Sequence, residues 1–287
     1  MIQIEKYHGT GNDFVIVDAD AGVPDRRAFA RRLCDRDTGI EHADAMQRGA
    51  DGVLFLALEP EFTPPRAVMT LVQPDGSVAA MCGNGARCAA EWAARRLRRS
   101  GAFDGAVMID TQSGTRRATV GDAITIEMGN PAFAPADVPV DSDEPFVERD
   151  VGPLTVTAVN TGVPHAVAMV DDVDAVDLEE IAPSVRHADI FPRGANVTLA
   201  ARTGEGYRQR TFERGVEGET DSCGTGAVAV GAVAHRLDHV EAGETVQVSP
   251  PGGDLDVTIT DHTATLRGPV AHEFSTEVGV ERPVADD

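Results

Sequence analysis

The chain has 287 residues, a formal net charge of −22, and only one lysine, Lys6, among its 25 basic residues. A pyridoxal-phosphate enzyme needs a Schiff-base lysine and a Walker A loop needs a lysine after its glycines, so we expect neither class. Strong negative charge repels the phosphate backbone, so we expect no nucleic-acid partner. The apolar share of 42% is typical of a soluble globular protein with a core.

The N-terminus and the cysteines indicate a cytoplasmic protein. Residues 1–13 contain no basic region followed by an apolar stretch, and apolar runs such as Val53 to Leu58 are far shorter than the roughly 20 residues of a membrane helix. The four cysteines form no CxxC pair and match no common zinc spacing, so we expect reduced thiols and no metal. Scattered carboxylates and scarce lysine favour a halophilic protein of a salt-rich cytoplasm.

The predicted elements are mainly strands. In the first half, a helix is predicted at Arg26 to Cys34, and strands at Gln3 to Tyr7, Phe14 to Val17, Val53 to Leu58, Ala67 to Val72, Val107 to Asp110 and Ile124 to Met128. In the second half, a helix is predicted at Leu178 to Arg186, and strands at Leu154 to Asn160, Ala166 to Val170, Asn196 to Ala200, Tyr207 to Phe212, Thr245 to Val248, Leu255 to Thr260 and Ala264 to Leu266.

One segment of the sequence repeats. Residues 82–95 (CGNGARCAAEWAAR) align with residues 223–236 (CGTGAVAVGAVAHR), and six of the fourteen positions agree. Both segments become helical after their glycines, and the second carries almost no charge, which predicts a helix that is buried on nearly every side. Two similar halves of ordinary domain size follow. We therefore predict an α+β fold of two pseudo-symmetric, strand-rich domains, each with a sheet wrapped around a central buried helix.

The repeated segment begins with a cysteine in a chemically favourable place. A cysteine at a helix N-terminus faces unpaired backbone N–H groups and the positive end of the helix dipole, which favour the thiolate. The same N–H groups bind a carboxylate, and the glycines let it approach closely. Two such units, Cys82 and Cys223, fit inversion at a carbon next to a carboxylate, with one thiolate removing a proton and the other thiol delivering one. Cys34 and Cys88 are interpreted as small buried hydrophobic residues.

A phosphate-binding role for the same glycines is weaker. Gly83-Asn-Gly85 and Gly224-Thr-Gly226 lack the full G-x-G-x-x-G spacing of a dinucleotide loop, and no lysine follows them.

Five blocks of the sequence resemble the signature motifs of the diaminopimelate epimerase family. Their order extends along nearly the whole chain: residues 8–14 (HGTGNDF), 81–88 (MCGNGARC), 162–165 (GVPH), 212–215 (FERG) and 219–226 (ETDSCGTG). The resemblance implies a cofactor-independent epimerase of lysine biosynthesis, often a homodimer, that interconverts LL- and meso-diaminopimelate. It also implies an N-terminal half at residues 1–122, completed by a strand from about 270–280, and a C-terminal half at residues 123–269.

The resemblance also assigns roles to individual residues. Cys82 and Cys223 match the acid/base pair, and His165 and Glu213 match the polar pair near the reacting centre. The matched substrate-binding positions are Asn12, Gln73, Gly83, Asn84, Asn196, Glu213, Arg214, Gly224 and Thr225.

Two departures from the family pattern affect the substrate assignment, and an insertion is a further difference. Gln73 and Val163 stand where the family has asparagines that bind the distal end of the substrate, and the valine side chain forms no hydrogen bond. An insertion around Glu41 to Arg48 is predicted to form a surface loop near the site. A racemase or epimerase of another amino acid is therefore an alternative, as is a non-catalytic amino-acid-binding protein; a phenazine-type isomerase is disfavoured because both cysteines are present.

Overall fold

The computed structural model describes residues 1–280, which divide into two compact units. Unit 1 comprises Met1–Ile126 and the described part of the segment that begins at Pro269, and unit 2 comprises Glu127–Gly268. The boundary falls within β8 (Ile124–Gly129), a few residues beyond the crossover expected near Asp122. No helix among residues 1–280 is long and apolar enough to cross a membrane.

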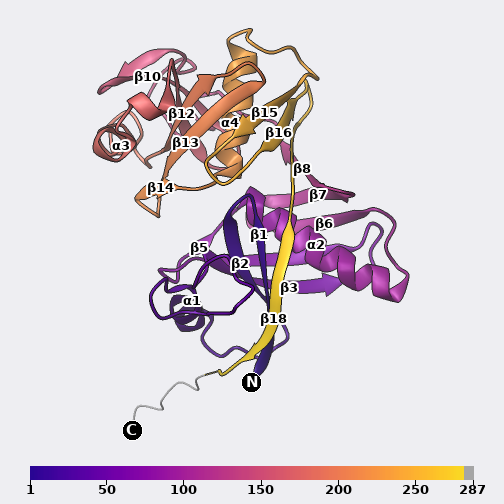
Figure 1. The fold of residues 1–287 in the computed structure, drawn as a ribbon. Coiled ribbons are helices and arrows are strands. Elements are labelled where there is room, and N and C mark those ends of the chain that lie inside the picture. The colour runs from indigo at the N-terminus through magenta and orange to yellow at the C-terminus, as the bar shows by residue number, and fades with distance from the viewer. Residues whose placement is uncertain (281–287) are drawn as a thin grey trace. The chain divides into compact units, whose positions relative to one another are not determined.

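Among the described residues, unit 1 is a sheet of strands with the helices α1 and α2 (Figure 1). Its elements are β1 (Ile2–Gly9), β2 (Asn12–Asp18), α1 (Arg26–Cys34), β3 (Gly52–Glu59), β4 (Arg66–Val72), β5 (Val78–Ala79), α2 (Gly83–Ser100), β6 (Ala106–Thr111), β7 (Gly114–Val120), the start of β8, and β18 (Ala271–Val278). The strands pair in the order β18–β1–β2–β3–β4–β6–β7–β8, and β5 pairs with β4. Figure 1 shows β18, in yellow, beside the indigo β1.

Unit 2 repeats this arrangement. Its elements are β9 (Arg149–Val151), β10 (Leu154–Asn160), β11 (Pro164–Val170), the 3-10 turn η1 (Val173–Ala175), α3 (Leu178–Arg186), β12 (Asn196–Arg202), β13 (Gly206–Glu213), β14 (Gly218–Thr220), α4 (Gly224–Arg236), β15 (Thr245–Ser249), β16 (Leu255–Ile259) and β17 (Ala264–Gly268). The strands pair in the order β9–β10–β11–β12–β13–β15–β16–β17, and β14 pairs with β13. The parallel pairs occupy equivalent places in the two units: β2–β3 and β4–β6 in unit 1 correspond to β11–β12 and β13–β15 in unit 2. The internal repeat and the α+β class predicted from the sequence are therefore confirmed.

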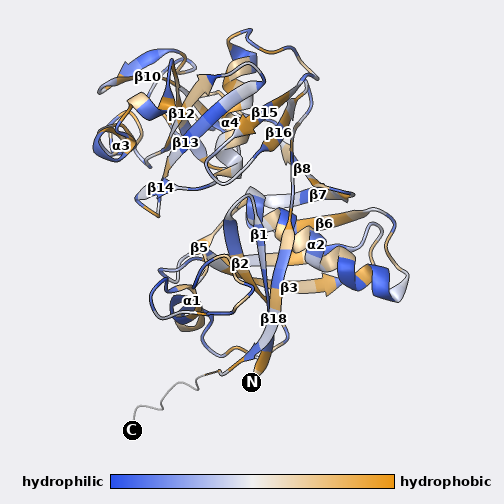
Figure 2. Cartoon of the chain, in the orientation of Figure 1, coloured by the Kyte–Doolittle hydropathy of each residue, from blue (hydrophilic) through white to orange (hydrophobic). Residues whose placement is uncertain are grey.

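The central helices α2 and α4 are enclosed by these sheets. Helix α2 packs against β1, β2, β3, β4, β6 and β7, and α4 packs against β10 to β13 and β15 to β17. Every residue of α4 from Gly224 to Ala234 is buried, as expected for a helix that is apolar all round. The outer end of α2 is blue in Figure 2 because arginines cluster there, and it stops at Gly101, whose φ of 73° suits glycine.

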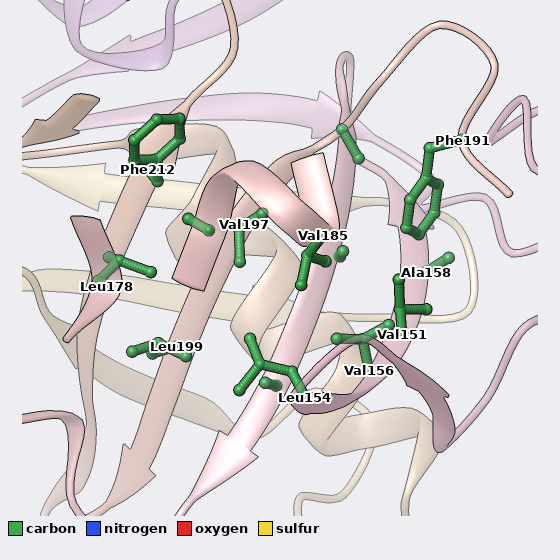
Figure 3. Close-up of a cluster of buried hydrophobic side chains, with 14 of the residues drawn as sticks. Val151, Leu154, Val156, Ala158, Leu178, Val185, Phe191, Val197, Leu199 and Phe212 are labelled. Carbon is green, nitrogen blue, oxygen red and sulfur yellow. The ribbon is translucent and has the colours of Figure 1, made fainter. Parts of the chain in front are cut away.

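The core of unit 2 holds its half of the site in place. Leu178 and Val185 of α3 pack with Val156, Val197 and Leu199 of the neighbouring strands (Figure 3). Burying aliphatic side chains of this size stabilises the fold by about 1.5–3 kcal/mol each. The strands that carry the polar site residues of unit 2 are thereby anchored on their opposite face.

Several predicted elements agree with the structure and others were missed. The helices predicted at Arg26 to Cys34 and Leu178 to Arg186 have the predicted bounds, and Asp25 and Asp177 cap them by accepting backbone N–H groups. Strands β5, β7, β9 and β14 were not predicted from the sequence. Three of these are only two or three residues long, too short for a period-2 pattern to be recognised.

Candidate active site

Each unit places one cysteine at the N-cap of its central helix. Cys82 precedes α2 and Cys223 precedes α4, both with extended backbone, and Gly83 and Gly224 are the first helical residues. The cysteine carbonyls accept the first intrahelical hydrogen bonds, from the backbone N–H of Ala86 at 2.8 Å and from that of Ala227 at 2.9 Å. The backbone N–H groups of the two residues that follow each cysteine therefore lie ahead of the helical ladder, where helices commonly bind anions.

In unit 1, the Cys82 thiol contacts a side-chain amide oxygen and a backbone N–H group. Its Sγ donates to Asn12 Oδ1 at 3.8 Å and accepts from the backbone N–H of Gly85 at 3.4 Å. Asn84 Nδ2 also donates to Asn12 Oδ1, at 3.3 Å. The structure therefore brings together three of the predicted residues of unit 1, namely Asn12, Cys82 and Asn84.

Gln73 is not joined to this group by hydrogen bonds. It follows β4 in a tight turn, where its backbone bonds to Ser77 and Gly76 and its Oε1 accepts from the Ser77 hydroxyl at 2.9 Å. Its role at the distal end of a substrate stays a prediction.

Unit 1 also holds a buried arginine that was not predicted as a site residue. Arg87 is fully buried on α2, and its Nη2 donates to Thr10 Oγ1 at 2.9 Å, while Nε and Nη1 have no hydrogen-bond partner among the described residues. Burial lowers the pKa of Arg87 to about 10, and nearby Cys88 and Cys82 oppose this shift. The corresponding position of the second repeat is Val228. A charged residue aligned with an apolar one was the sequence signal that could have indicated a special role for Arg87.

In unit 2, Cys223 belongs to a buried chain of hydrogen bonds. Its Sγ is 3.4 Å from Thr225 Oγ1, which is 3.0 Å from Nε2 of His165. The other ring nitrogen of His165 is 3.1 Å from Thr198 Oγ1. Burial lowers the pKa of His165 to about 3, so the imidazole is neutral at physiological pH and does not act there as a cation.

The remaining predicted residues of unit 2 extend from the same strands. Asn196 begins β12, and its Nδ2 is 3.5 Å from His165 Nε2 while its Oδ1 accepts from the backbone N–H of Arg214 at 2.8 Å. The Arg214 guanidinium donates to the backbone carbonyl of Arg193 at 3.2 Å. Glu213 ends β13 and accepts from the Thr220 hydroxyl at 2.6 Å. Unit 2 thus gathers His165, Asn196, Arg214, Cys223 and Thr225 around the start of α4.

Cys34 and Cys88 have different surroundings from the two N-cap cysteines. Both are buried, and burial raises the pKa of Cys34 to about 12 and raises the pKa of Cys88 as well. A thiol of this kind is neutral at physiological pH and packs as a small hydrophobic group.

Known proteins share these motifs and this fold. The family described as "Diaminopimelate epimerase" matches residues 4–134 and 157–273. A diaminopimelate epimerase of Methanocella arvoryzae is 40% identical over 98% of both chains. The chain belongs to the diaminopimelate epimerase family. Membership confirms the predicted enzyme class, an amino-acid racemase or epimerase.

Two further relatives extend the comparison beyond diaminopimelate epimerases. An O-ureido-serine racemase of Streptomyces lavendulae is 36% identical over 94% of this chain and 92% of its own. The solved structure of a PhzF-family phenazine biosynthesis protein from Bacillus anthracis has a TM-score of 0.67, with 16% identity over 97% of this chain and 99% of that chain. At that identity the second likeness supports the fold of the diaminopimelate epimerase family and not an activity.

Proposed function

We propose that the protein interconverts LL- and meso-diaminopimelate in lysine biosynthesis without a cofactor, using Cys82 and Cys223 as its acid/base pair. The observation that carries the proposal is the repetition of one device: a cysteine at the N-cap of a buried helix that continues Gly-x-Gly, once in each unit. We also propose that the two units correspond to the epimerase halves expected at residues 1–122 and 123–269.

The cysteine and the helix start of each unit supply the acid, the base and the N–H donors that stereoinversion requires. The thiolate of one cysteine removes the α-proton and becomes a thiol, and the electron pair left on the α-carbon is delocalised into the substrate carboxylate. Backbone N–H groups at the helix starts stabilise that charge as it develops. The other thiol then delivers its proton to the opposite face and becomes a thiolate. The protonation states are exchanged after each turnover, so the enzyme is ready for the reverse direction.

Other proposed residues orient this chemistry. His165 is neutral and contacts the Thr225 hydroxyl, which in turn contacts Cys223, so we assign the imidazole to holding that hydroxyl in place. The remaining substrate-binding assignments are Asn12, Gln73, Gly83, Asn84, Asn196, Glu213, Arg214 and Gly224, as the matched motifs imply.

A racemase or epimerase of another amino acid is the second candidate. Val163 lies in the turn before β11 and has no side-chain donor or acceptor, and a racemase of another amino acid is 36% identical to this chain. Chiral chromatography after incubation with LL-diaminopimelate, O-ureidoserine and a panel of other amino acids separates the two candidates. Inversion of LL-diaminopimelate above all others supports the first proposal, whereas inversion of another amino acid alone supports the second.

We further propose a homodimer in a salt-rich cytoplasm, where thiols stay reduced. The support is the family resemblance for the dimer and the charge of −22 with one lysine for the salt. Concentrated potassium chloride screens the repulsion among the carboxylates, so the midpoint of thermal unfolding is expected to rise from low to molar salt. A midpoint that is the same across that range would contradict halophilic adaptation.

A further inference from the structure

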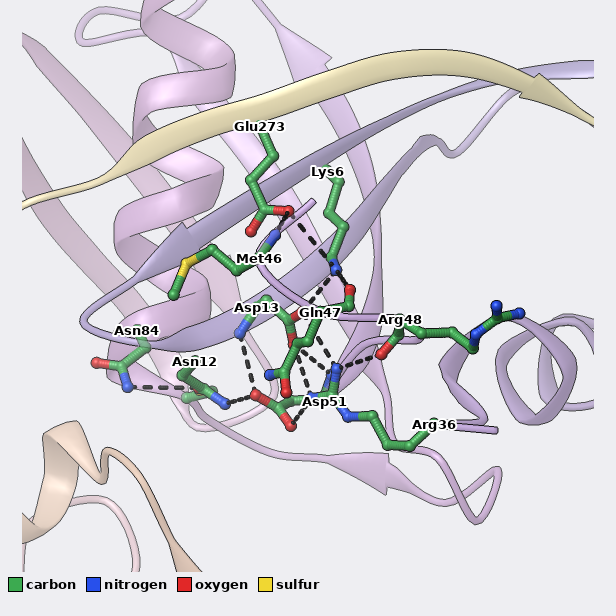
Figure 4. Close-up of polar contacts among 11 residues, drawn as sticks. Lys6, Asn12, Asp13, Arg36, Met46, Gln47, Arg48, Asp51, Asn84 and Glu273 are labelled. Atoms are coloured by element: carbon green, nitrogen blue, oxygen red, sulfur yellow. Dashed lines mark hydrogen bonds and ion pairs between the residues drawn. The ribbon is translucent and has the colours of Figure 1, made fainter. Parts of the chain in front are cut away.

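The single lysine of the chain lies in a cluster of charged side chains in unit 1 (Figure 4). Lys6 is completely buried, and its Nζ is 2.7 Å from Asp13 Oδ2 and 3.6 Å from Glu273 Oε2. It also donates to the backbone carbonyl of Gln47 at 2.7 Å. Gln47 belongs to the inserted loop, so this loop contacts the buried lysine.

Two carboxylates stand side by side in the cluster. Arg36 Nη2 is 2.8 Å from Asp13 Oδ1 and 2.5 Å from Asp51 Oδ1. The backbone N–H of Asp13 donates to Asp51 Oδ2 at 3.0 Å, and that of Asp51 donates to Asp13 Oδ1 at 3.1 Å. Burial and the charge of Asp13 raise the pKa of Asp51, and Arg36 opposes this shift. Both oxygens of Asp51 therefore accept hydrogen bonds, Oδ1 from Arg36 and Oδ2 from the backbone N–H of Asp13.

Asp51, whose two oxygens act as acceptors, determines which way the Asn12 carboxamide points. Asn12 Nδ2 donates to Asp51 Oδ2 at 2.5 Å. A carboxylate only accepts hydrogen bonds, so it must meet the nitrogen of the amide and never the oxygen. The oxygen of Asn12 is therefore turned toward Cys82 and Asn84, whose Sγ and Nδ2 both donate to it.

We propose that the cluster of Lys6, Asp13, Arg36 and Asp51 is a positioning device that holds the Asn12 oxygen toward Cys82 and so favours the protonated thiol. A hydrogen bond that the thiol donates stabilises its protonated form, whereas the Gly85 N–H stabilises the thiolate. The Asn12 oxygen thus favours the thiol form of Cys82, and the Gly85 N–H favours its thiolate form. The use of both forms of Cys82 in catalysis rests on the proposed function, whereas the orientation of Asn12 does not.

The test measures alkylation of Cys82 by iodoacetamide as a function of pH, without substrate, and identifies the modified peptide by mass spectrometry. In Asp51→Asn the charged Arg36 keeps the amide oxygen, so the new amide nitrogen faces Asn12 Nδ2 and the backbone N–H of Asp13 and accepts from neither. Asn12 must then rotate and present its own nitrogen to Cys82, which favours the thiolate. We expect the pH midpoint of alkylation to fall by about half a unit or more.

A double-mutant cycle separates this rotation from the loss of charge at position 51. Removing a nearby carboxylate lowers the midpoint by itself, but that effect persists when Asn12 is Ala, whereas the effect of rotation disappears. Asp51→Asn is therefore expected to lower the midpoint much less in the Asn12→Ala background than in the native one. An equal shift in both backgrounds, or no shift in the native one, would overturn the proposal.

A matched control comes from the Arg66–Glu59 pair. Its atoms are 2.5 Å apart and its side chains are 33% and 31% exposed, close to the 38% and 37% of Arg36 and Asp51. Glu59→Gln makes the same chemical change without a link to Asn12, and it should leave the alkylation midpoint unchanged. A midpoint that falls as far as in Asp51→Asn would overturn the proposal.

If Asp51→Asn does not fold, Asp51→Ala releases Asn12 in the same way, and its shift must likewise depend on Asn12. Because no substrate is present, this result is independent of whether the protein is an epimerase.

Discussion

Cys82→Ala is expected to lower the rate of amino-acid inversion by about 10²–10⁴-fold, the usual contribution of a positioned acid or base. The change removes the group that exchanges protons and leaves the backbone N–H groups at the start of α2 in place. Substrate binding, measured by calorimetry, is therefore expected to persist. Such a separation of binding from turnover also distinguishes an epimerase from a binding protein that uses the same contacts.

Cys88→Ala is the matched control because it removes a thiol from the same helix. Cys88 is fully buried, and its loss leaves a small cavity that costs about 1 kcal/mol of unfolding free energy. Inversion by this variant is expected to stay within a few-fold of the native rate. If Cys82→Ala retained native turnover, or if Cys88→Ala lost as much as Cys82→Ala, the assignment of Cys82 would be wrong.

Gly226→Ala is expected to reduce turnover by about 10²-fold and to destabilise unit 2 by about 1–3 kcal/mol. A Cβ at this position would lie 2.5 Å from Nε2 of Gln209 and 3.1 Å from Oγ1 of Thr211. Gln209 is buried and cannot move aside easily, because its Nε2 donates to Thr211 Oγ1 at 2.9 Å and to the Cys223 carbonyl at 3.2 Å. The start of α4 must therefore shift, and Cys223 shifts with it.

The equivalent change in the first repeat, Gly85→Ala, has more room. Its nearest neighbours would be Leu54 at 3.4 Å and Cys82 Cβ at 3.5 Å. Alanine also favours a helix over glycine by up to about 1 kcal/mol. Denaturant unfolding and turnover, measured on both variants, should show a stable and active Gly85→Ala beside an impaired Gly226→Ala. Equal damage to both would contradict the packing described for α4.

The sequence was informative where a pattern is local. Helix α1 follows Asp25 and helix α3 follows Asp177, and these N-caps with apolar residues at helical spacing define both elements. Strand β7 was missed because Arg116 and Arg117 interrupt its short apolar pattern, although alternate residues Ala118 and Val120 are buried. The repeated cysteine segments predicted the two-unit α+β fold because the same succession of strand pairings surrounds both helices.

The polar surroundings of Cys82 were beyond sequence reasoning. Asp51 and Asn12 are 39 positions apart, and only the fold places the carboxylate against the amide. Lys6 was notable as the single lysine, but its pairing with Asp13 depends on the register of β1 and β2 and on the inserted loop. Arg87 was part of a recognised motif, yet its complete burial depends on the strands that pack around α2, among them β1, where a Cβ on Gly9 would lie 3.0 Å from Arg87 Nη2.

The central claim, inversion by two thiols, is tested most directly by the position of label early in the reaction. LL-diaminopimelate is incubated in deuterium oxide under reducing conditions at high salt, and product and remaining substrate are analysed by mass spectrometry before equilibrium. Two separate groups remove and deliver the proton, so the meso product should carry one deuterium at the inverted carbon while the recovered LL substrate carries almost none. Deuterium entering substrate and product at equal rates, or product that keeps the substrate's own proton, would contradict a two-thiol mechanism.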